Sequence, residues 1–270
     1  MFNLFILAIF LFFNTNYADI FSESKSLTNN FYYNNTKAKK SKNENNNNPI
    51  INNELNKTVI NLNTTNVISL KGVINSKSVN RFLYEFNLNN NKNNLFIFID
   101  SVGGSVEDGY KIISEIKKYN VSCVTEKAYS MAFAILQVCH KRYLLPYGKI
   151  MQHQISFGIT NELGKIESYL IFVNQMENEL LKLQSDKIGI TPEELKNKTN
   201  NEWWLFGDNA LNENCVDEIV YVECSKELTK ETYLINDGMY DYIYSKCPLI
   251  PDYLDKIQNN KNSKDFIYFI

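Results

Sequence analysis

The chain has 270 residues, of which 44% are hydrophobic and 21% charged, so it can build one or two domains with a sizeable core. Its formal net charge is −2 and it contains no block of Lys and Arg, which argues against a nucleic-acid partner. The five cysteines show no CxxC and no metal-ligand spacing, so we expect neither a metal nor a cofactor. In an oxidising compartment Cys224 and Cys247 are candidates for a disulfide, although their spacing does not require one.

The N-terminus carries an apolar run from Leu4 to Phe13, LFILAIFLFF. The run is too short for a comfortable membrane span, but its length is typical of the apolar region of a secretory signal peptide. We therefore predict a signal peptide over 1–18 with cleavage near Ala18, although no Lys or Arg precedes the run. The alternative is an uncleaved anchor. A signal peptide implies entry into the secretory pathway, with a final site that is secreted, luminal or a plastid-like organelle reached through that pathway.

Asn, Lys and Ser dominate the stretch 19–66, which includes NENNNN before Pro49. Such a composition cannot bury enough apolar surface to offset the entropy of ordering, so we predict a disordered leader or linker. The periodic part begins at Val67, and we assign 67–224 to one folded domain. The remaining residues, 225–270, form a Tyr-rich C-terminal extension for which the sequence indicates no role.

Apolar runs alternate with helical patterns in the first half of the domain. A strand, VISLKGVI, precedes a helix that begins within NSKSVNRFLYEF, with Ser76 or Ser78 as the N-cap. A buried strand, NLFIFID, is followed by two glycines and then by isoleucines and a tyrosine at helical spacing. The run VSCVTEKAYS predicts a strand that leads into a helix, MAFAILQVC, and two further strand-like segments are RYLLP and KIMQHQ.

The second half of the domain is dominated by a long amphipathic helix. Apolar side chains recur on one face from Ile166 to Leu183, and Gly189 is the residue expected just past the end of the helix. Thr191 and Pro192 then open another helix as its N-cap and first helical residue. Strands and helices that alternate at these lengths predict an α/β fold with a largely parallel sheet.

Several residues in this pattern are candidates for anion-binding or reactive chemistry. Gly103 and Gly104 either form a tight turn or present backbone N–H groups to an anion. Ser130, where a strand meets a helix, is either an ordinary N-cap or a nucleophile beside oxyanion donors. The chain has two histidines. His153 ends an apolar strand, where ligands collect in α/β sheets, whereas His140 lies in a polar connector and is expected to be a solvated turn residue.

The order of the short motifs is more specific than any one of them. The chain carries SVGGS, YSMA, MQHQI, a long helix and a segment ending in VDEI, in that order. From about Val67 to Cys224 this order resembles the ClpP family of serine peptidases, whose members carry SPGGS, ASMG and MIHQP at the first three places. The resemblance implies a ClpP/crotonase-like fold, with stacked ββα units and a long oligomerisation helix.

The resemblance also implies roles for single residues. Ser130 would be the nucleophile and His153 the general base, while the N–H groups of Gly104 and Met131 would form the oxyanion hole. Reading back without gaps from VDEI places Glu202 where the family has its triad aspartate. Ser-His-Glu triads occur on other folds, so glutamate is chemically suitable as the third member.

Departures from the family pattern keep other interpretations open. Asp208 is the alternative triad acid, although it more naturally serves the first turn of the following helix. Val102 and Ile155 replace two family prolines, and Glu202 replaces the aspartate, which favours a non-catalytic structural subunit of a ring as an alternative function. A crotonase-type acyl-CoA enzyme, which shares the backbone oxyanion hole, is a further alternative, but the acidic catalytic residues usual in such enzymes are not found.

The leading interpretation is a serine-type endopeptidase that cleaves peptides or unfolded chains inside a homo- or hetero-oligomeric ring. The sequence contains no GxxxxGK[ST] motif, so ATP-driven unfolding would have to come from an AAA+ unfoldase partner. Phe96 and Phe98 keep aromatic side chains where the resemblance implies a chaperone-docking pocket. The plainer explanation for both is that they are buried aromatic residues of a strand.

Overall fold

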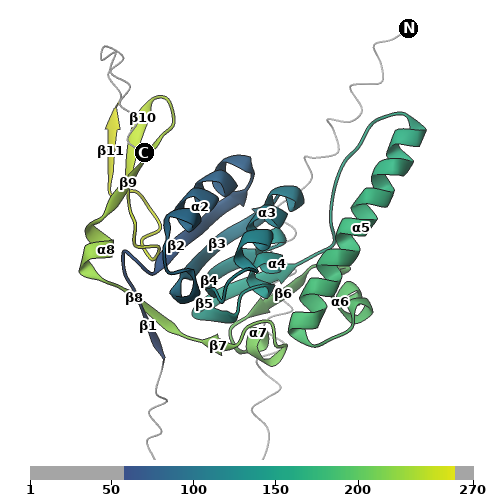
Figure 1. Cartoon of the computed structure of the whole chain (residues 1–270), viewed down its shortest axis with the longest axis horizontal. Helices are drawn as coiled ribbons and strands as arrows, with labels where there is room; N and C mark the ends of the chain where they lie inside the picture. The colour runs from purple at the N-terminus through teal and green to yellow at the C-terminus, as the bar shows by residue number, and fades with distance from the viewer. Residues whose placement is uncertain (1–57, 259–270) are drawn as a thin grey trace, which may run out of the picture. The chain divides into compact units, whose positions relative to one another are not determined.

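The predicted strands form the central sheet of the structure, a computed structural model that describes residues 58–258 (Figure 1). Strands β2 to β5 are parallel and adjacent in chain order, β6 runs antiparallel to β5, and the short β7 pairs in parallel with β5. This arrangement confirms the predicted α/β fold with a largely parallel sheet. The strands of this sheet are β2 (Val67–Ile74), β3 (Phe96–Gly104), β4 (Ser122–Tyr129), β5 (Lys141–Gln152), β6 (Trp203–Phe206) and β7 (Glu218–Ile219).

Helices α2, α3 and α4 lie on one face of this sheet (Figure 1). Their apolar side chains and those of the sheet form one continuous core, which includes Phe82, Ile112 and Phe133. The helices of the described residues are α2 (Ser76–Leu88), α3 (Val106–Ile116), α4 (Met131–Gln137), α5 (Leu163–Ile188), α6 (Pro192–Thr199), α7 (Asp208–Asn212) and α8 (Lys226–Lys230), with a short 3-10 helix, η1 (Lys92–Asn94).

The ends of the helices follow the local sequence signals, with one correction. Helix α6 begins as predicted, because the Thr191 hydroxyl accepts from the N–H of Glu194 at 3.1 Å. Helix α2 begins on Asn75, not on Ser76 or Ser78. The Asn75 side chain accepts from the N–H of Ser78 at 3.0 Å, and Ser78 completes a capping box. Asparagine and serine are both favoured at an N-cap, so neighbouring candidates are hard to separate by residue type alone.

Strand β5 is longer than predicted. RYLLP and KIMQHQ were expected as two strand-like segments, but a single strand runs from Lys141 to Gln152. Its pairing with β4 shifts register between Leu144 and Lys149, and Pro146 lies within that irregular stretch. Proline lacks an N–H for the ladder and is tolerated at such an irregularity, so it does not end the strand here.

A second apolar cluster lies apart from the main core and contains Phe98, which is 0% exposed. It includes side chains of β1 (Val59–Leu62), which pairs in parallel with β8 (Tyr221–Cys224). Strand β1 falls inside the stretch 19–66 that we assigned to the disordered leader, so the folded part begins before Val67. Buried and exposed residues alternate along β1, but its sequence, Val-Ile-Asn-Leu, starts with two apolar residues and lies in an Asn-rich stretch, so the strand was not predicted.

The C-terminal extension folds onto this cluster. Cys247 belongs to the cluster and forms a disulfide with Cys224, the pairing considered from the sequence, and the Pro248 carbonyl accepts from Lys71 Nζ at 2.8 Å. A second disulfide, which the sequence did not indicate, joins Cys123 to Cys139. The extension also forms an antiparallel sheet of β9 (Thr232–Asn236), β10 (Tyr240–Ser245) and β11 (Asp255–Gln258).

The predicted signal peptide, 1–18, and most of the predicted leader lie outside the described residues. Across the residues that the structure describes, none of the helices combines the length and apolar character that a membrane span needs.

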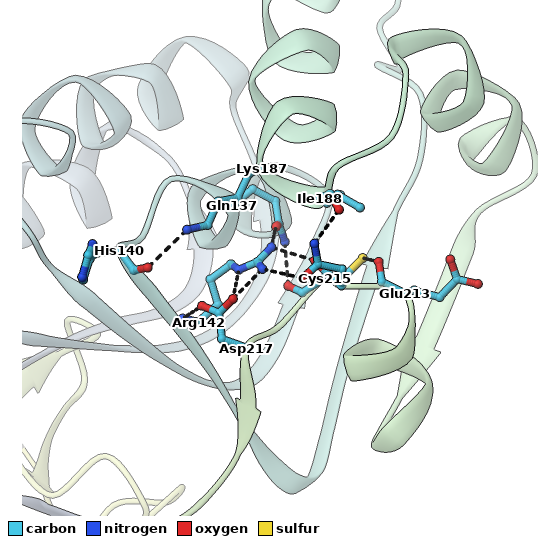
Figure 2. Close-up of polar contacts among 9 residues, drawn as sticks. Gln137, His140, Arg142, Lys187, Ile188, Glu213, Cys215 and Asp217 are labelled. Carbon is cyan, nitrogen blue, oxygen red and sulfur yellow. Dashed lines mark hydrogen bonds and ion pairs between the residues drawn. The ribbon is translucent and has the colours of Figure 1, made fainter.

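Arg142 is the centre of a buried polar cluster that joins β5 to the segment before β7 (Figure 2). The residue is 1% exposed. Its guanidinium donates to Asp217 Oδ1 at 2.6 Å, to Gln137 Oε1 at 2.7 Å and to the Asn214 carbonyl at 2.9 Å. A buried guanidinium is tolerated only when its donors are paired, so these bonds hold the VDEI segment against the sheet.

We expect Asp217→Asn to lower the free energy of unfolding and to make that free energy depend less on pH in the acid range. Burial by itself raises the pKa of the Asp217 carboxyl, but hydrogen bonds from Arg142 outweigh it and hold the pKa below its ordinary value. The ion pair therefore contributes stability above the unfolded-state pKa of about 3.9, and this contribution is lost as the pH falls through the lower folded-state pKa. Breaking a buried pair costs roughly 3–5 kcal/mol, and because Asp217 is partly exposed we expect the lower end.

Urea unfolding at pH 7 and at a series of lower pH values would measure both effects. The matched control is Glu213→Gln, which breaks the more exposed pair between Lys198 Nζ and Glu213 Oε2 at 2.9 Å. That loss should stay below about 1 kcal/mol. Equal losses for the two variants would contradict the structural role given to Arg142 and Asp217.

Candidate active site

Ser130 lies between the end of β4 and the start of α4 in an unusual backbone conformation. Its φ is 56° and its ψ is −121°, a region that residues with a side chain rarely adopt. The Ser130 N–H donates to the Met151 carbonyl of β5 at 2.9 Å. The helix assignment makes Ser130 the N-cap of α4, but its hydroxyl makes no capping hydrogen bond. Strain of this kind persists only where the surroundings impose it, and it is common at functional sites.

Gly103 and Gly104 are the last two residues of β3, and close backbone contacts require both to be glycine. A Cβ on Gly103 would lie 2.4 Å from the Tyr129 carbonyl oxygen and 2.8 Å from Ser130 Cβ. A Cβ on Gly104 would lie 2.2 Å from the Ile74 carbonyl oxygen. Both residues also have positive φ, 84° and 146°. They are not the tight turn considered from the sequence, because both pair with β2 within the strand, and they bring the end of β3 against Ser130.

The backbone N–H groups near Ser130 are not equivalent. The N–H of Gly103 donates to Ser101 Oγ at 3.1 Å within β3. Gly104, the predicted oxyanion donor, is exposed. Met131, the second predicted donor, is the first residue of α4, and its N–H belongs to the first turn of the helix, where backbone donors lack intrahelical partners.

His153 lies at the same edge of the sheet as Ser130. Strands β4 and β5 are parallel, and Tyr129 pairs with Met151, so Ser130 and His153 both follow the carboxyl ends of paired strands. His153 is half-buried and lines a hollow together with residues of α5 and α6. Within residues 58–258, no hydrogen bond joins Ser130 to the imidazole. Catalytic hydrogen bonds are often long or poorly aligned in unliganded enzymes.

Glu202 lies directly before β6, whose first residue, Trp203, pairs with Gln152 at the end of β5. His153 directly follows Gln152, so the two candidate residues flank the last pair of this antiparallel ladder. Glu202 has a positive φ of 62°. Its carboxylate accepts from the indole Nε1 of Trp204 at 2.9 Å. The side chain therefore has a partner other than the imidazole.

The other candidate residues lie outside the site formed by Ser130 and His153. Asp208 is exposed in the first turn of α7, the role that its sequence context favours. His140 is exposed, and its carbonyl accepts from Lys187 Nζ at 3.2 Å. Phe98 is fully buried in the second apolar cluster, with Phe96 packed against it. In the part of the chain that is described, no group of three or more His, Cys, Asp or Glu is arranged to hold a metal ion.

Two contacts around His153 were not predicted. The indole of Trp204 bonds to Glu202, and the side chain of Gln152 bonds to Gln184 on α5. The residue types of one strand or helix do not indicate which residue elsewhere in the chain a side chain will bond to. The one available signal was that Gln152, a polar residue, occupies an apolar position of the related motif.

Ser130, Gly103 and His153 thus lie at one edge of a largely parallel sheet in an α/β protein, with Ser130 in a strained backbone conformation. The family model described as Clp protease matches residues 51–223, well over half of the chain. This chain therefore belongs to the Clp protease family, and its α/β fold agrees with that assignment, as the motif order predicted. Its folded part contains a ClpP-like protease domain.

Curated relatives agree with the family assignment. The chain is 29% identical over 140 residues to the ATP-dependent Clp protease proteolytic subunit 2 of Pseudomonas aeruginosa, covering 50% of this chain and 69% of that protein. It is 28% identical over 134 residues to the protein of the same name from Borreliella burgdorferi, with 48% and 68% covered. The corresponding figures for Tropheryma whipplei are 25% over 139 residues, with 49% and 77% covered.

Proposed function

We propose that this chain is a serine-type endopeptidase in which Ser130, His153 and Glu202 form the catalytic triad. The observation that carries the proposal is the position of Ser130. Its backbone is held in a strained conformation against Gly103, at the sheet edge that also carries His153. The Ser130 hydroxyl makes no capping hydrogen bond that would account for that conformation.

The proposed reaction follows from the groups at this edge. His153 removes the proton from Ser130 Oγ as the oxygen attacks the peptide carbonyl, and returns it to the leaving amine. The N–H groups of Gly104 and Met131 stabilise the oxyanion that forms on the carbonyl oxygen. Water then hydrolyses the acyl-enzyme, with His153 again as the base. Glu202 orients the imidazole and stabilises its protonated form.

A fluorophosphonate probe tests the proposal directly, because it reacts with activated serines. We expect one modified residue, Ser130, in the folded full-length chain, and no reaction after heat denaturation. The Ser122→Ala variant is the matched control, since Ser122 lies at the opposite end of β4 and its loss should leave labelling intact. Labelling elsewhere, or none at all, would contradict the proposed nucleophile.

A second candidate function is a structural subunit of a protease ring. It is favoured by the hydrogen bond that holds Glu202 to Trp204 and by the missing contact between Ser130 and His153. A folded chain that assembles but reacts with no serine-directed probe would support this alternative.

We also propose that the chain assembles into rings through the N-terminal half of α5. That half exposes apolar side chains that a monomer would normally bury, with Leu163 71% and Ile171 62% exposed. Leu170 and Phe172 are also exposed, whereas Val173 is buried within the subunit. The predicted apolar face from Ile166 to Leu183 thus divides into a part that packs on the subunit and a part that is open.

Charged residues on the open part of α5 should break the assembly. We expect the double substitution Leu170→Glu and Ile171→Glu to convert rings to smaller species, because charges would be buried in an apolar contact. Light scattering on size-fractionated protein would measure the mass. Leu88→Glu is the matched control, since Leu88 is equally exposed but lies on α2. A wild-type chain that is already monomeric would refute the ring proposal.

A ClpP-like ring without an ATPase motif would rely on a partner to unfold proteins, and we propose an AAA+ unfoldase. Of the two aromatic residues that the family resemblance assigned to docking, Phe96 is partly exposed and Phe98 is buried in the cluster that contains Cys247. Docking at Phe98 would require that cluster to open. A pull-down with and without the extension 225–270 would show whether it blocks the partner.

We propose that the chain enters the secretory pathway through residues 1–18. The support is that the folded part contains two disulfides, Cys123–Cys139 and Cys224–Cys247, which persist in oxidising compartments. N-terminal sequencing of the protein isolated from its own cells should begin after Ala18. A mature chain that begins at Met1 and has Cys123, Cys139, Cys224 and Cys247 reduced would contradict this location.

A further inference from the structure

A buried pair of glutamines connects the long helix to the candidate active site. Gln152, the last residue of β5, is 7% exposed, and Gln184 on α5 is 2% exposed. Gln152 Nε2 donates to Gln184 Oε1. Gln184 Nε2 in turn donates to the Leu180 carbonyl of its own helix at 2.8 Å.

The pair continues into the backbone of the candidate general base. The N–H of His153 donates to Gln152 Oε1 at 3.2 Å. On the other side of His153, Gln154 Nε2 donates to Asn200 Oδ1 at 2.5 Å. The orientation of each side-chain amide in the pair is fixed. If the Gln184 amide were flipped, its oxygen would face the Leu180 carbonyl oxygen, and neither group could donate a hydrogen bond. Helix α5 and the His153 backbone are therefore joined by hydrogen bonds in series.

Packing alone does not require these glutamines. Burying an amide is costly unless its hydrogen bonds are made, and an apolar pair of similar size would fill the same space without that requirement. The related motif MIHQP has isoleucine where this chain has Gln152. The polar pair therefore supplies something that an apolar pair would not, namely a directional link between α5 and His153.

We propose that Gln152 and Gln184 are positioning residues that transmit the placement of α5 to His153. This inference rests on the proposed function, in which His153 is the general base. Because the exposed half of α5 is the proposed contact between subunits, assembly would adjust the imidazole through this pair. The residues touch neither the substrate carbonyl nor the nucleophile, and they act through the backbone of His153.

Single and double substitutions separate positioning from plain stabilisation. Gln152→Leu or Gln184→Leu alone should lower the unfolding midpoint, because the remaining amide is buried without its partner. The double variant replaces both partners by apolar groups and should recover most of the midpoint. We expect its kcat to remain about tenfold to a hundredfold below wild type at similar KM, as for a displaced catalytic group. If kcat recovers together with the midpoint, the pair is only structural and the proposal is overturned.

A readout that needs no activity is the imidazole signal of His153. The chain has two histidines, so in full-length protein with ¹³C-labelled histidine the His140→Gln variant assigns the spectrum. We expect Gln184→Leu to shift the His153 signal. Gln137→Leu, which removes another buried glutamine from the Arg142 cluster, should leave it in place.

The two kinds of failure can be told apart. A wild-type chain without turnover would defeat the proposed function, whereas a shift of the His153 signal would still establish the link to α5. Normal turnover with an unmoved His153 signal in Gln184→Leu would overturn the link alone.

Discussion

Ser130→Ala is expected to abolish peptide hydrolysis while leaving the unfolding midpoint and the state of assembly unchanged. The hydroxyl is the attacking group in the proposed reaction, and loss of the nucleophile in a comparable triad lowers kcat by a factor on the order of 10⁶. The structure explains why stability should not suffer. Ser130 occupies the N-cap position of α4, but its hydroxyl makes no capping hydrogen bond, so alanine removes no such contact.

Ser105→Ala is the informative control for that variant. Ser105 is the N-cap of α3, and its hydroxyl accepts from the N–H of Asp108 at 3.2 Å. Loss of a working cap costs about 1 kcal/mol, so this variant should be less stable. Thermal unfolding and turnover of a fluorogenic peptide would be measured on both. Equal turnover by Ser130→Ala and wild type would remove Ser130 from the mechanism, and a loss of stability like that of Ser105→Ala would make it an ordinary cap.

The strands and helices could be predicted where the residues of one short segment determine its structure. The apolar run before Gly103 can only be a buried strand, and Thr191 with Pro192 starts a helix by local bonds. Motif order then identified Ser130 and His153, since both follow strands whose carboxyl ends meet at one edge in a parallel sheet. The same local logic could not choose Asn75 over its serine neighbours, because their capping preferences are alike.

What could not be predicted depends on contacts between distant segments. Arg142 bonds to Asp217, and Gln152 bonds to Gln184. The partners lie far apart in the sequence, so the local spacing of residue types does not predict these pairs. Strand β1 forms because β8, far along the chain, offers it a partner. The hydrogen-bond partner of the Glu202 side chain could not be predicted either. Motif alignment proposed Glu202 as the triad acid, but its hydrogen-bond partner is Trp204, whose ring packs on Tyr129 with ring centroids 4.9 Å apart.

Glu202 is the residue that decides between an enzyme and a structural subunit. If it orients His153, its carboxylate must leave the Trp204 indole and turn to the imidazole of the residue that follows the last β5–β6 pair. We expect Glu202→Gln to lower kcat steeply, because an amide preserves a contact but favours the wrong imidazole tautomer. The corresponding change of an aspartate in a comparable triad cost about 10⁴ in kcat.

Two companion variants make the Glu202 prediction decisive. Trp204→Phe removes the competing indole donor but keeps an aromatic ring against Tyr129, so it should hold or raise kcat if Glu202 is the triad acid. Glu202→Asp should hold or raise kcat if the backbone is placed as in the family, and lower it if the positive φ of Glu202 suits the longer side chain. Steady-state peptide hydrolysis would measure kcat and KM for all of these variants.

A kinetically silent Glu202→Gln in an active enzyme would exclude Glu202 from the triad. If every variant, including Glu202→Asp and Trp204→Phe, is inactive like the wild type, the chain is a structural subunit, because neither restoring the family acid nor freeing it from Trp204 produces catalysis.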